Sequence, residues 1–377
     1  MDVENRIKQY LEQRSKLGLL RKLTLVTDKI DFSSNDYLGL SRSAFLRQQI
    51  EAEYKQYRNQ PAGATGSRLL NGNFELHEAV EQLLATHFHA ESATLFNSGF
   101  DANVGLISTV ARPGDYIFYD ELMHASVHQG MMLSGAILVA FKHNDLEDLE
   151  RKLNQIDTSI NSFIITESVF SMEGDKADLR QMADLSSKYN ANLIVDEAHA
   201  TGIFGSHGSG LCNELNIENK CFARVYTFGK AMGGHGAVVV GAAWLKTYLI
   251  NFSKNFIYTT AMDTHTLLSV KHSIFHAQLF ANQRNKLFLL IQYFEEEIRA
   301  SALVYRVYGN GPIFGIIVPG NDFCRAFSVF LQQNGLDVRP ILSPTVPIGA
   351  ERLRVIIHSY NTKAQIDFLI SLLVDYK

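Results

Sequence analysis

A lysine behind an apolar run is the first residue in this sequence whose setting points to chemistry. The run 225–228 is strand-like, and Gly229 and Lys230 follow it directly, ahead of glycines at 233, 234 and 236. A lysine in a crowded, glycine-lined turn at a strand end can have a lowered pKa and form an imine as a neutral amine. A lone lysine is more often a solvated charge, so a second functional group nearby is needed to support the imine.

A second apolar run, 193–196, ends in Asp196 and continues into Glu197, Ala198 and His199. These four residues also occur in helicase-type ATPases, but that function requires a GxxxxGK[ST] phosphate loop upstream, and the sequence has none. The alternative is a carboxylate beneath the pyridine nitrogen of a pyridoxal ring, which makes the ring an electron sink. An isolated Asp is more often structural. However, Lys230 stands 34 positions after Asp196, behind the next strand, so both can face one crevice.

Two further motifs begin where strand-like runs end. Gly99 follows the run 93–96 at the start of a helix, where close backbone approach and free N–H groups suit a phosphate. His124 follows the run 116–119 and can stack on a cofactor ring. His124 and His128 are also spaced like metal ligands, but no third ligand accompanies them, so we expect no metal site.

The elements that must position these groups alternate along the chain. Between residues 90 and 245, short apolar runs alternate with helical stretches, which predicts an α/β fold with a mostly parallel sheet covered on both faces. Ligands bind at the carboxyl ends of the strands in such sheets. The seven expected strands are 93–96, 116–119, 137–141, 163–167, 193–196, 225–228 and 238–242.

The two ends of the chain carry different patterns. Residues 4–22 predict an amphipathic helix, and 29–33 predict a short strand. Near the other end, 265–300 contains no Gly or Pro and predicts one long helix. A strand over 313–318, a helix over 323–334, two more strands and a final helix capped near Asn361 and Thr362 predict a smaller α+β lobe.

Composition excludes several classes of protein. Lys and Arg number 35 against 39 Asp and Glu, giving a net charge of −4 without a long basic run, so we expect no nucleic-acid partner. The apolar stretch 237–245 is far shorter than the roughly 20 residues of a membrane span. Three cysteines without a CxxC pair, and no secretory h-region in 1–25, favour a cytoplasmic protein.

Taken together, the motifs resemble those of the α-oxoamine synthases, which are fold-type I pyridoxal-phosphate enzymes with the aminotransferase class I/II fold. The resemblance extends from the Phe-Ser-Ser-Asn-Asp-Tyr-Leu-Gly-Leu segment at 32–40 to the Arg-Leu-Arg-Val segment at 352–355. It implies a seven-stranded, mostly parallel sheet in a large domain and a smaller C-terminal α+β domain. We expect an N-terminal segment at 1–45, a pyridoxal-phosphate-binding domain at 46–275 and the small domain at 276–377.

The resemblance assigns a role to each motif. It implies that Lys230 carries pyridoxal 5′-phosphate as a Schiff base, that Asp196 holds the pyridine nitrogen, that His199 bonds the phenolic oxygen and that His124 stacks on the ring. Family members are homodimers with sites at the subunit interface, where Thr259 or Thr260 reaches the partner's phosphate. The other residues expected around the cofactor are Gly99, Phe100, Ser171 and Thr227.

Within the family, the chain most resembles the branch that makes 8-amino-7-oxononanoate for biotin. This implies decarboxylative condensation of L-alanine with a pimeloyl thioester of acyl carrier protein or coenzyme A. The Pro-Thr-Val-Pro-Ile-Gly segment at 344–349 carries part of this likeness, but the loop 67–72 resembles serine palmitoyltransferases as well. Glycine C-acetyltransferase is a further alternative. The expected substrate-binding residues are Arg21, Asn35, Thr345 and Arg354.

Overall fold

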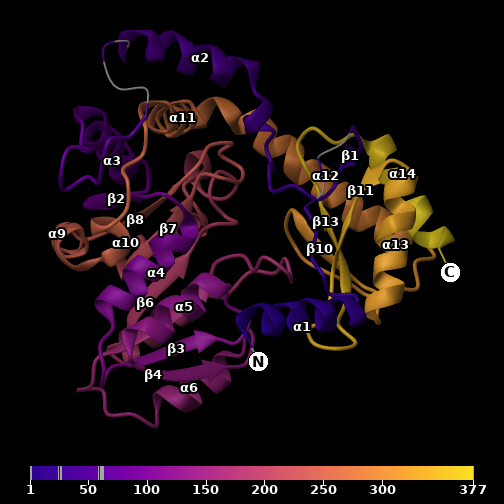
Figure 1. Cartoon of the computed structure of the whole chain (residues 1–377), viewed down its shortest axis with the longest axis horizontal. Coiled ribbons are helices and arrows are strands. Elements are labelled where there is room, and N and C mark those ends of the chain that lie inside the picture. Colours follow the sequence, from indigo (N-terminus) through magenta and orange to yellow (C-terminus); the bar gives the residue numbers. More distant parts are fainter. Residues whose placement is uncertain (1, 24, 26–27, 58, 60–62, 377) are drawn as a thin grey trace.

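The computed structural model describes residues 2–23, 25, 28–57, 59 and 63–376, which form a large and a small lobe (Figure 1). Within the described residues, the large lobe is built on a seven-stranded sheet in the order β2-β8-β7-β6-β5-β3-β4. Only β8 runs antiparallel to its neighbours β2 and β7. The strands are β2 (Ser92–Phe96), β3 (Tyr116–Asp120), β4 (Ile137–Phe141), β5 (Ser162–Glu167), β6 (Asn192–Asp196), β7 (Cys221–Thr227) and β8 (Ala237–Gly241).

Both faces of this sheet are buried, as β8 shows most directly. Ala237 and Val239 belong to one hydrophobic cluster, whereas Val238 and Val240 belong to a second. Successive side chains of a strand point to opposite faces, so the two clusters are the two sides of the sheet. The helices of this lobe are α2 (Ala44–Tyr54), α3 (Glu75–His87), α4 (Gly99–Val110), α5 (Ala125–Ser134), α6 (Leu146–Leu153), α7 (Leu179–Lys188), α8 (Leu211–Glu214), α9 (Ala243–Phe252), α10 (Lys254–Ile257) and α11 (Thr264–Phe275).

The small lobe contains an antiparallel sheet in the order β12-β13-β10-β9 and a parallel pair, β1-β11. Because β1 comes from the N-terminal segment and β11 from near the end of the chain, the two ends meet here. The strands are β1 (Ile30–Asp31), β9 (Val307–Tyr308), β10 (Ile313–Ile317), β11 (Leu336–Asp337), β12 (Arg339–Ile341) and β13 (Arg352–Ile356), and the helices are α12 (Ala281–Ala300), α13 (Asn321–Gln333) and α14 (Lys363–Asp375).

The first helix is shorter than the sequence pattern predicted. Helix α1 (Val3–Lys16) ends before Gly18, which has φ +64°, and the N–H of Leu19 bonds back to the carbonyl of Arg14. A left-handed glycine behind the last turn is a common helix stop. Arg21 therefore lies beyond the helix and cannot cap its C-terminus. The apolar residues of α1, such as Ile7 and Leu11, are exposed.

The long helix predicted for 265–300 is two helices. Helix α11 ends at Phe275, a 3₁₀ turn spans Ala277–Phe280, and α12 begins at Ala281. Helix α11 packs on α2 and α3 in the large lobe, whereas α12 packs on α14 in the small lobe (Figure 1). The buried Arg284 donates to the carbonyl of Ala277 and so supports the break. We propose this 3₁₀ turn as the boundary between the two domains.

Other expectations at the C-terminal end agree with the structure more closely. The last helix, α14, is capped by Thr362, whose hydroxyl accepts from the N–H of Gln365. Gly335, with φ +84°, follows α13. Strand β4, which we expected to be buried, lies at the sheet edge and exposes Ile137 and Leu138. Among the described residues, no helix is both long and apolar enough to span a membrane.

Candidate active site

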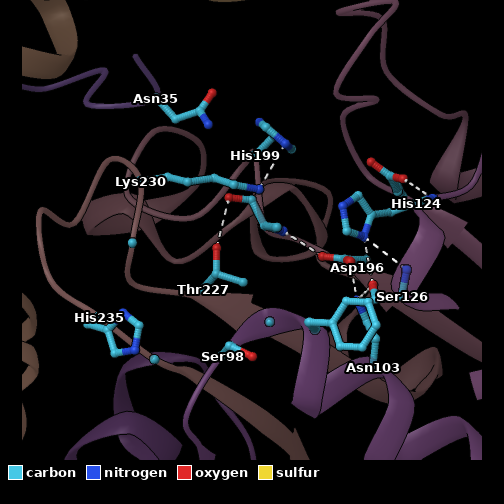
Figure 2. Close-up of a pocket in the computed structure, with 16 residues that line it drawn as sticks. Asn35, Ser98, Asn103, His124, Ser126, Asp196, His199, Thr227, Lys230 and His235 are labelled. Atoms are coloured by element: carbon cyan, nitrogen blue, oxygen red, sulfur yellow. Dashed lines mark hydrogen bonds between the residues drawn. The ribbon is translucent and has the colours of Figure 1, made fainter. Parts of the chain in front are cut away.

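A cavity of about 270 Å³ lies at the carboxyl ends of the central strands (Figure 2). It collects residues that follow β2, β3, β6 and β7, because parallel strands direct their C-terminal loops to one edge of the sheet. The lining residues are Asn35, Ser98, Gly99, Phe100, Asn103, His124, Ser126, Glu167, Asp196, Ala198, His199, Thr227, Gly229, Lys230, His235 and Gly236.

Lys230 points into this cavity from the turn between β7 and β8. Its Nζ lies 2.8 Å from Nε2 of His199 (Figure 2). Burial lowers the pKa of Lys230 from 10.5 to about 8, against the opposing effect of Asp196 and Glu167. A substantial fraction of this amine is therefore neutral near physiological pH, as a nucleophile or a base requires.

Asp196 ends β6 and is almost fully buried. One carboxylate oxygen accepts from the N–H of Ala198 at 2.9 Å, and the other accepts from Nδ2 of Asn103 at 2.7 Å. Asn103 stands on α4, and its Nδ2 also lies 3.0 Å from Oγ of Ser126. The carboxylate is thus held in one orientation at the cavity floor, where it can bond a ring N–H.

His124 is the N-cap of α5, and its own backbone N–H donates to Oε1 of Glu167 at 2.8 Å. Burial, and then the neighbouring Asp196, raise the pKa of Glu167 to about 8. Burial also lowers the pKa of His124, so its imidazole is mainly neutral near pH 7. Nδ1 of His124 lies 2.7 Å from Oγ of Ser126, which fixes the ring over the cavity.

His199 joins the large lobe to residues from the N-terminal segment. Its Nδ1 lies 2.6 Å from the hydroxyl of Tyr37, and this hydroxyl lies 3.2 Å from Oδ1 of Asn35. Arg354 on β13 donates from Nη2 to the same Asn35 oxygen at 3.1 Å and from Nε to the carbonyl of Ser171 at 2.7 Å. Arg354 is not among the residues that line the cavity, but it contacts Asn35, which is.

Gly99 and Thr227 form the opposite wall of the cavity. A Cβ at Gly99 would lie 2.6 Å from Cγ2 of Thr227, so only glycine allows this approach. Gly99 opens α4, and the preceding Ser98 caps the helix by accepting from the N–H of Asp101. The first N–H groups of α4 thus face the cavity wall, which suits a phosphate.

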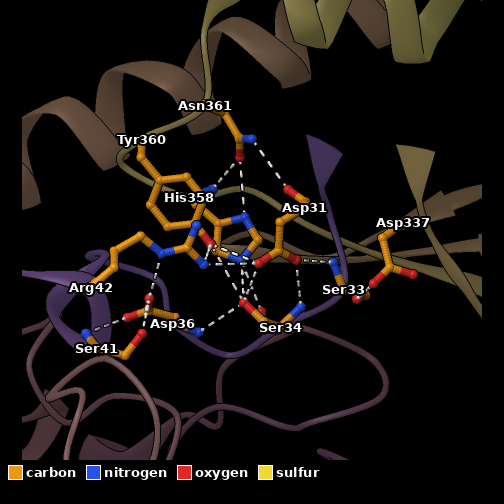
Figure 3. A network of polar contacts seen from close by, with 10 residues as sticks. All are labelled: Asp31, Ser33, Ser34, Asp36, Ser41, Arg42, Asp337, His358, Tyr360 and Asn361. Carbon is orange, nitrogen blue, oxygen red and sulfur yellow. Dashed lines mark hydrogen bonds and ion pairs between the residues drawn. The ribbon is translucent and has the colours of Figure 1, made fainter. Parts of the chain in front are cut away.

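A network of polar contacts holds the N-terminal segment to the small lobe (Figure 3). At its centre, Asp31 accepts from both Ser33 and Ser34 and from the hydroxyl of Tyr360. We call this the Asp31 network; its members are Asp31, Ser33, Ser34, Asp36, Ser41, Arg42, Asp337, His358, Tyr360 and Asn361.

Some of the expected site residues do not line the cavity. Thr259 and Thr260 lie beside it, where Nδ2 of Asn97 donates to the Thr259 hydroxyl at 3.0 Å and to the Thr260 carbonyl at 2.8 Å. Ser171 contributes its carbonyl to Arg354 rather than a side chain to the cavity. Thr345 and Arg21 are exposed and are not among the lining residues.

Several residues that line the cavity or contact a lining residue were not predicted from the sequence. Asn103, Ser126, Glu167 and Tyr37 carried no role, although each lies within or next to a motif that we noted. Glu167 had a usable signal, because it ends the strand beside β6 as Asp196 ends β6. Asn103 follows Gly99 by one helical turn on α4. No local pattern shows that Tyr37 meets His199, 162 positions away.

The amino-acid sequence is similar to one known family and to individual enzymes. Residues 27–373 match the family described as aminotransferase class I and II. The chain is 38% identical to 8-amino-7-oxononanoate synthase of Emericella nidulans, over 97% of this chain and 93% of that protein. It is 35% identical to the 8-amino-7-oxononanoate synthase of Lysinibacillus sphaericus, over 98% of this chain and 97% of that protein.

Solved structures resemble the whole chain. Serine palmitoyltransferase of Sphingomonas wittichii has a TM-score of 0.91 at 27% identity, covering 100% of this chain and 98% of that one. 8-Amino-7-oxononanoate synthase of Francisella tularensis has a TM-score of 0.79 at 32% identity, covering 92% and 97%. A further serine palmitoyltransferase structure, at 25% identity and a TM-score of 0.91, contains PLP as an internal aldimine and covers 99% of this chain and 98% of that one. These matches confirm the expected fold type I architecture.

Proposed function

Because the chain belongs to the aminotransferase class I and II family and, within it, to the α-oxoamine synthases, we propose that it condenses L-alanine with a pimeloyl thioester, releasing carbon dioxide and the thiol of the acyl carrier. The product is 8-amino-7-oxononanoate, a biotin precursor. Family membership confirms the expectation of a pyridoxal-phosphate enzyme. The observation that carries the substrate proposal is the identity of 35–38% to 8-amino-7-oxononanoate synthases over nearly the whole chain.

The groups that line the cavity suit pyridoxal 5′-phosphate. Lys230 supplies an amine with a lowered pKa, Asp196 supplies a buried carboxylate for the ring nitrogen, and the start of α4 at Gly99 supplies N–H groups for the phosphate. His124 would cover the ring, and His199 would face its phenolic oxygen. When bound, the cofactor supplies an electron sink for the electrons released at the α-carbon of the amino acid.

The residues of the chain then handle the proton and the substrate carboxylate. The Nζ of Lys230, with a pKa of about 8, can take the α-proton of alanine as a neutral amine. The guanidinium of Arg354, which Asn35 and Ser171 hold in place, would bind the alanine carboxylate and so set the orientation of the α-hydrogen. Asn35 keeps Arg354 in place through its side-chain oxygen.

The acyl substrate is assigned to residues outside the cavity. We propose that Arg21 meets the far carboxylate of the pimeloyl chain and that Thr345 orients the acyl group. Both side chains are exposed in the single chain and free to meet a large thioester of acyl carrier protein or coenzyme A. A cytoplasmic location belongs to the same proposal and is supported by the three free cysteines.

The working unit in this proposal is a homodimer. Thr260 and Tyr258 are exposed beside the cavity, and the apolar Met132 and Leu133 of α5 are exposed as well, which suits a surface that a second copy covers. Mixing Lys230→Ala chains with chains changed to Ala at Thr259 and Thr260 should give more activity than either parent, because one hybrid site regains both parts. Full activity of a monomer in sedimentation would contradict the dimer.

Serine palmitoyl transfer is the second candidate, because the serine palmitoyltransferase structures have the higher TM-scores and the loop 67–72 resembles theirs. Product analysis separates the two. We expect L-alanine with a pimeloyl thioester to give the highest kcat/KM, above serine with a palmitoyl thioester and glycine with an acetyl thioester. A higher kcat/KM for serine and palmitoyl thioester would reject the biotin-pathway proposal and keep only the cofactor assignment.

A further inference from the structure

Tyr37 is the member of the site whose position the proposed reaction leaves unused. Its side chain is fully buried, and its hydroxyl lies between Nδ1 of His199 at 2.6 Å and Oδ1 of Asn35 at 3.2 Å. On the far side of the imidazole, Nε2 of His199 lies 2.8 Å from Nζ of Lys230. At the other end, Arg354 donates to the Asn35 oxygen. A continuous chain of hydrogen bonds therefore runs from Arg354 to Lys230.

The imidazole in the middle of this chain is neutral. Burial, and then the neighbouring Lys230 and Arg354, hold the pKa of His199 well below its ordinary value. A neutral imidazole has one N–H and one acceptor nitrogen. If Nε2 carries the hydrogen, Nδ1 is the acceptor that faces Tyr37. If Nε2 is the acceptor, Nδ1 carries the hydrogen and donates toward Tyr37.

Two arrangements of hydrogens satisfy the chain. When Lys230 is an ammonium group, Nε2 accepts from it, Nδ1–H donates to Tyr37, and the Tyr37 hydroxyl donates to Asn35. When Nε2 has to donate, to an oxygen of the bound cofactor, the Tyr37 hydroxyl donates to Nδ1 instead. A hydroxyl serves both arrangements because it is donor and acceptor at once, whereas Asn35 Oδ1 can only accept.

We propose that Tyr37 is a positioning residue that holds the His199 ring and bonds it in either tautomer, so that Nε2 can accept from Lys230 or donate to the cofactor. This inference rests on the proposed function for the identity of the cofactor, but not for the identity of the amino acid or the acyl group. It concerns residues of this chain only, and it predicts a change of tautomer on cofactor binding.

The backbone around Tyr37 is held in a way that suits this role. The N–H of Ser359 donates to the carbonyl of Tyr37 at 2.8 Å, and the Ser359 hydroxyl donates to the carbonyl of Leu38 at 2.9 Å. On both sides of these bonds lies the Asp31 network, in which Arg42 and Ser41 bond Asp36 and His358 bonds Ser34 (Figure 3). The backbone that carries the Tyr37 side chain is thus held in place. The Tyr37 hydroxyl therefore keeps its position if the His199 ring turns.

The test uses Tyr37→Phe in the cofactor-loaded enzyme. Its ring can fill the same space, so the change removes only the hydroxyl. Loss of a buried bond to His199 is worth about tenfold to a hundredfold in kcat, with the KM for the amino acid changing far less. The pH midpoint of the cofactor's visible absorption, measured without substrate, should also move, because the His199 hydrogen is no longer held.

Tyr226→Phe is the matched control. Tyr226 is equally buried and, like Tyr37, does not line the cavity, but its hydroxyl accepts from Nη1 of Arg224 at 2.9 Å rather than contacting His199. This variant should lose some thermal stability and leave the absorption midpoint unchanged. If Tyr37→Phe keeps both kcat and the absorption midpoint within the range of the Tyr226→Phe control, Tyr37 is only a packing residue and the inference is wrong.

A second measurement reads the tautomer in the wild-type protein itself and uses a variant only to assign the signal. Nitrogen-15 histidine NMR of the wild-type protein, with the His199 signal assigned by its loss in His199→Gln, reports which ring nitrogen carries the hydrogen. We expect Nδ1–H without cofactor near pH 7 and Nε2–H with cofactor. One tautomer in both states would overturn the inference. Failure of the proposed function is seen separately, because wrong substrate assignments change turnover products and leave this signal as expected.

Discussion

The cavity and the Asp31 network are both rich in polar groups, but they differ in how well their charges are compensated. In the cavity, neighbouring charges only partly offset the effect of burial, which disfavours a charged side chain. The pKa of Lys230 therefore falls to about 8, and the pKa of Glu167 rises to about 8. In the network, burial alone would raise the pKa of Asp31, but His358 and hydrogen bonds from Ser34 and Ser33 hold it well below its ordinary value. Compensated charges stabilise the fold, whereas uncompensated ones leave groups ready to exchange protons.

The Lys230→Ala substitution should have the largest effect, and it tests the difference between the cavity and the Asp31 network. Turnover should fall by several orders of magnitude, because both the cofactor attachment and the base are lost. Thermal stability should change little, since an under-compensated buried amine contributes little to folding. Kinetics and calorimetry measure the two effects, and borohydride reduction followed by mass mapping locates the attachment. A reduced adduct on another lysine would reject the assignment.

The protonation of the Lys230 amine as a function of pH tests whether the cavity lowers its pKa. In cofactor-free protein, the neutral amine fraction should rise through a midpoint of about 8, because the pKa is lowered from 10.5. Competitive acetylation followed by mass spectrometry measures this against Lys188, whose pKa is raised by its hydrogen bond to Glu150. Lys230 should therefore react fully at a pH where Lys188 is still protonated. Equal midpoints for the two lysines would show that the cavity does not perturb the amine.

Asp31→Asn tests the other region. Loss of the charge and of acceptor capacity for Ser33, Ser34 and Tyr360 should lower the free energy of unfolding by about 1–3 kcal/mol. Because the folded-state pKa of Asp31 lies below its unfolded value of about 3.9, its contribution is present above that pH and is lost as the pH falls. Urea unfolding at several pH values should show a weaker acid dependence in the variant. If the free energy of unfolding depends on acid pH equally in the variant and the wild type, the Asp31 charge is not stabilised by its network as described.

The smallest expected effect belongs to Arg21, which lies in neither region. Arg21→Ala should raise the KM for the pimeloyl thioester by about tenfold, the size of one charge-assisted hydrogen bond, and leave the melting temperature unchanged. Lys22→Ala is the matched control, since Lys22 is the adjacent exposed cation. Equal effects of the two substitutions on KM would indicate general attraction of the substrate rather than a specific contact.

The sequence by itself determined the strands and the groups that end them. Apolar runs separated by helices predict parallel strands, and the carboxyl ends of those strands have to meet, so the pattern alone brings Lys230, Asp196 and His124 to one crevice. Gly99 was identifiable for the same local reason, because a helix start behind a strand needs no distant partner.

Only the tertiary structure decided the contacts that come from far along the chain. Tyr37 reaches His199, Arg354 reaches Asn35, and Asn103 reaches Asp196 across separations that no periodicity encodes. The division of 265–300 into α11 and α12 has the same origin, since each half packs on a different lobe and no Gly or Pro marks the break. Apolar strand runs are local features of the sequence, whereas these contacts depend on how segments far apart along the chain pack together.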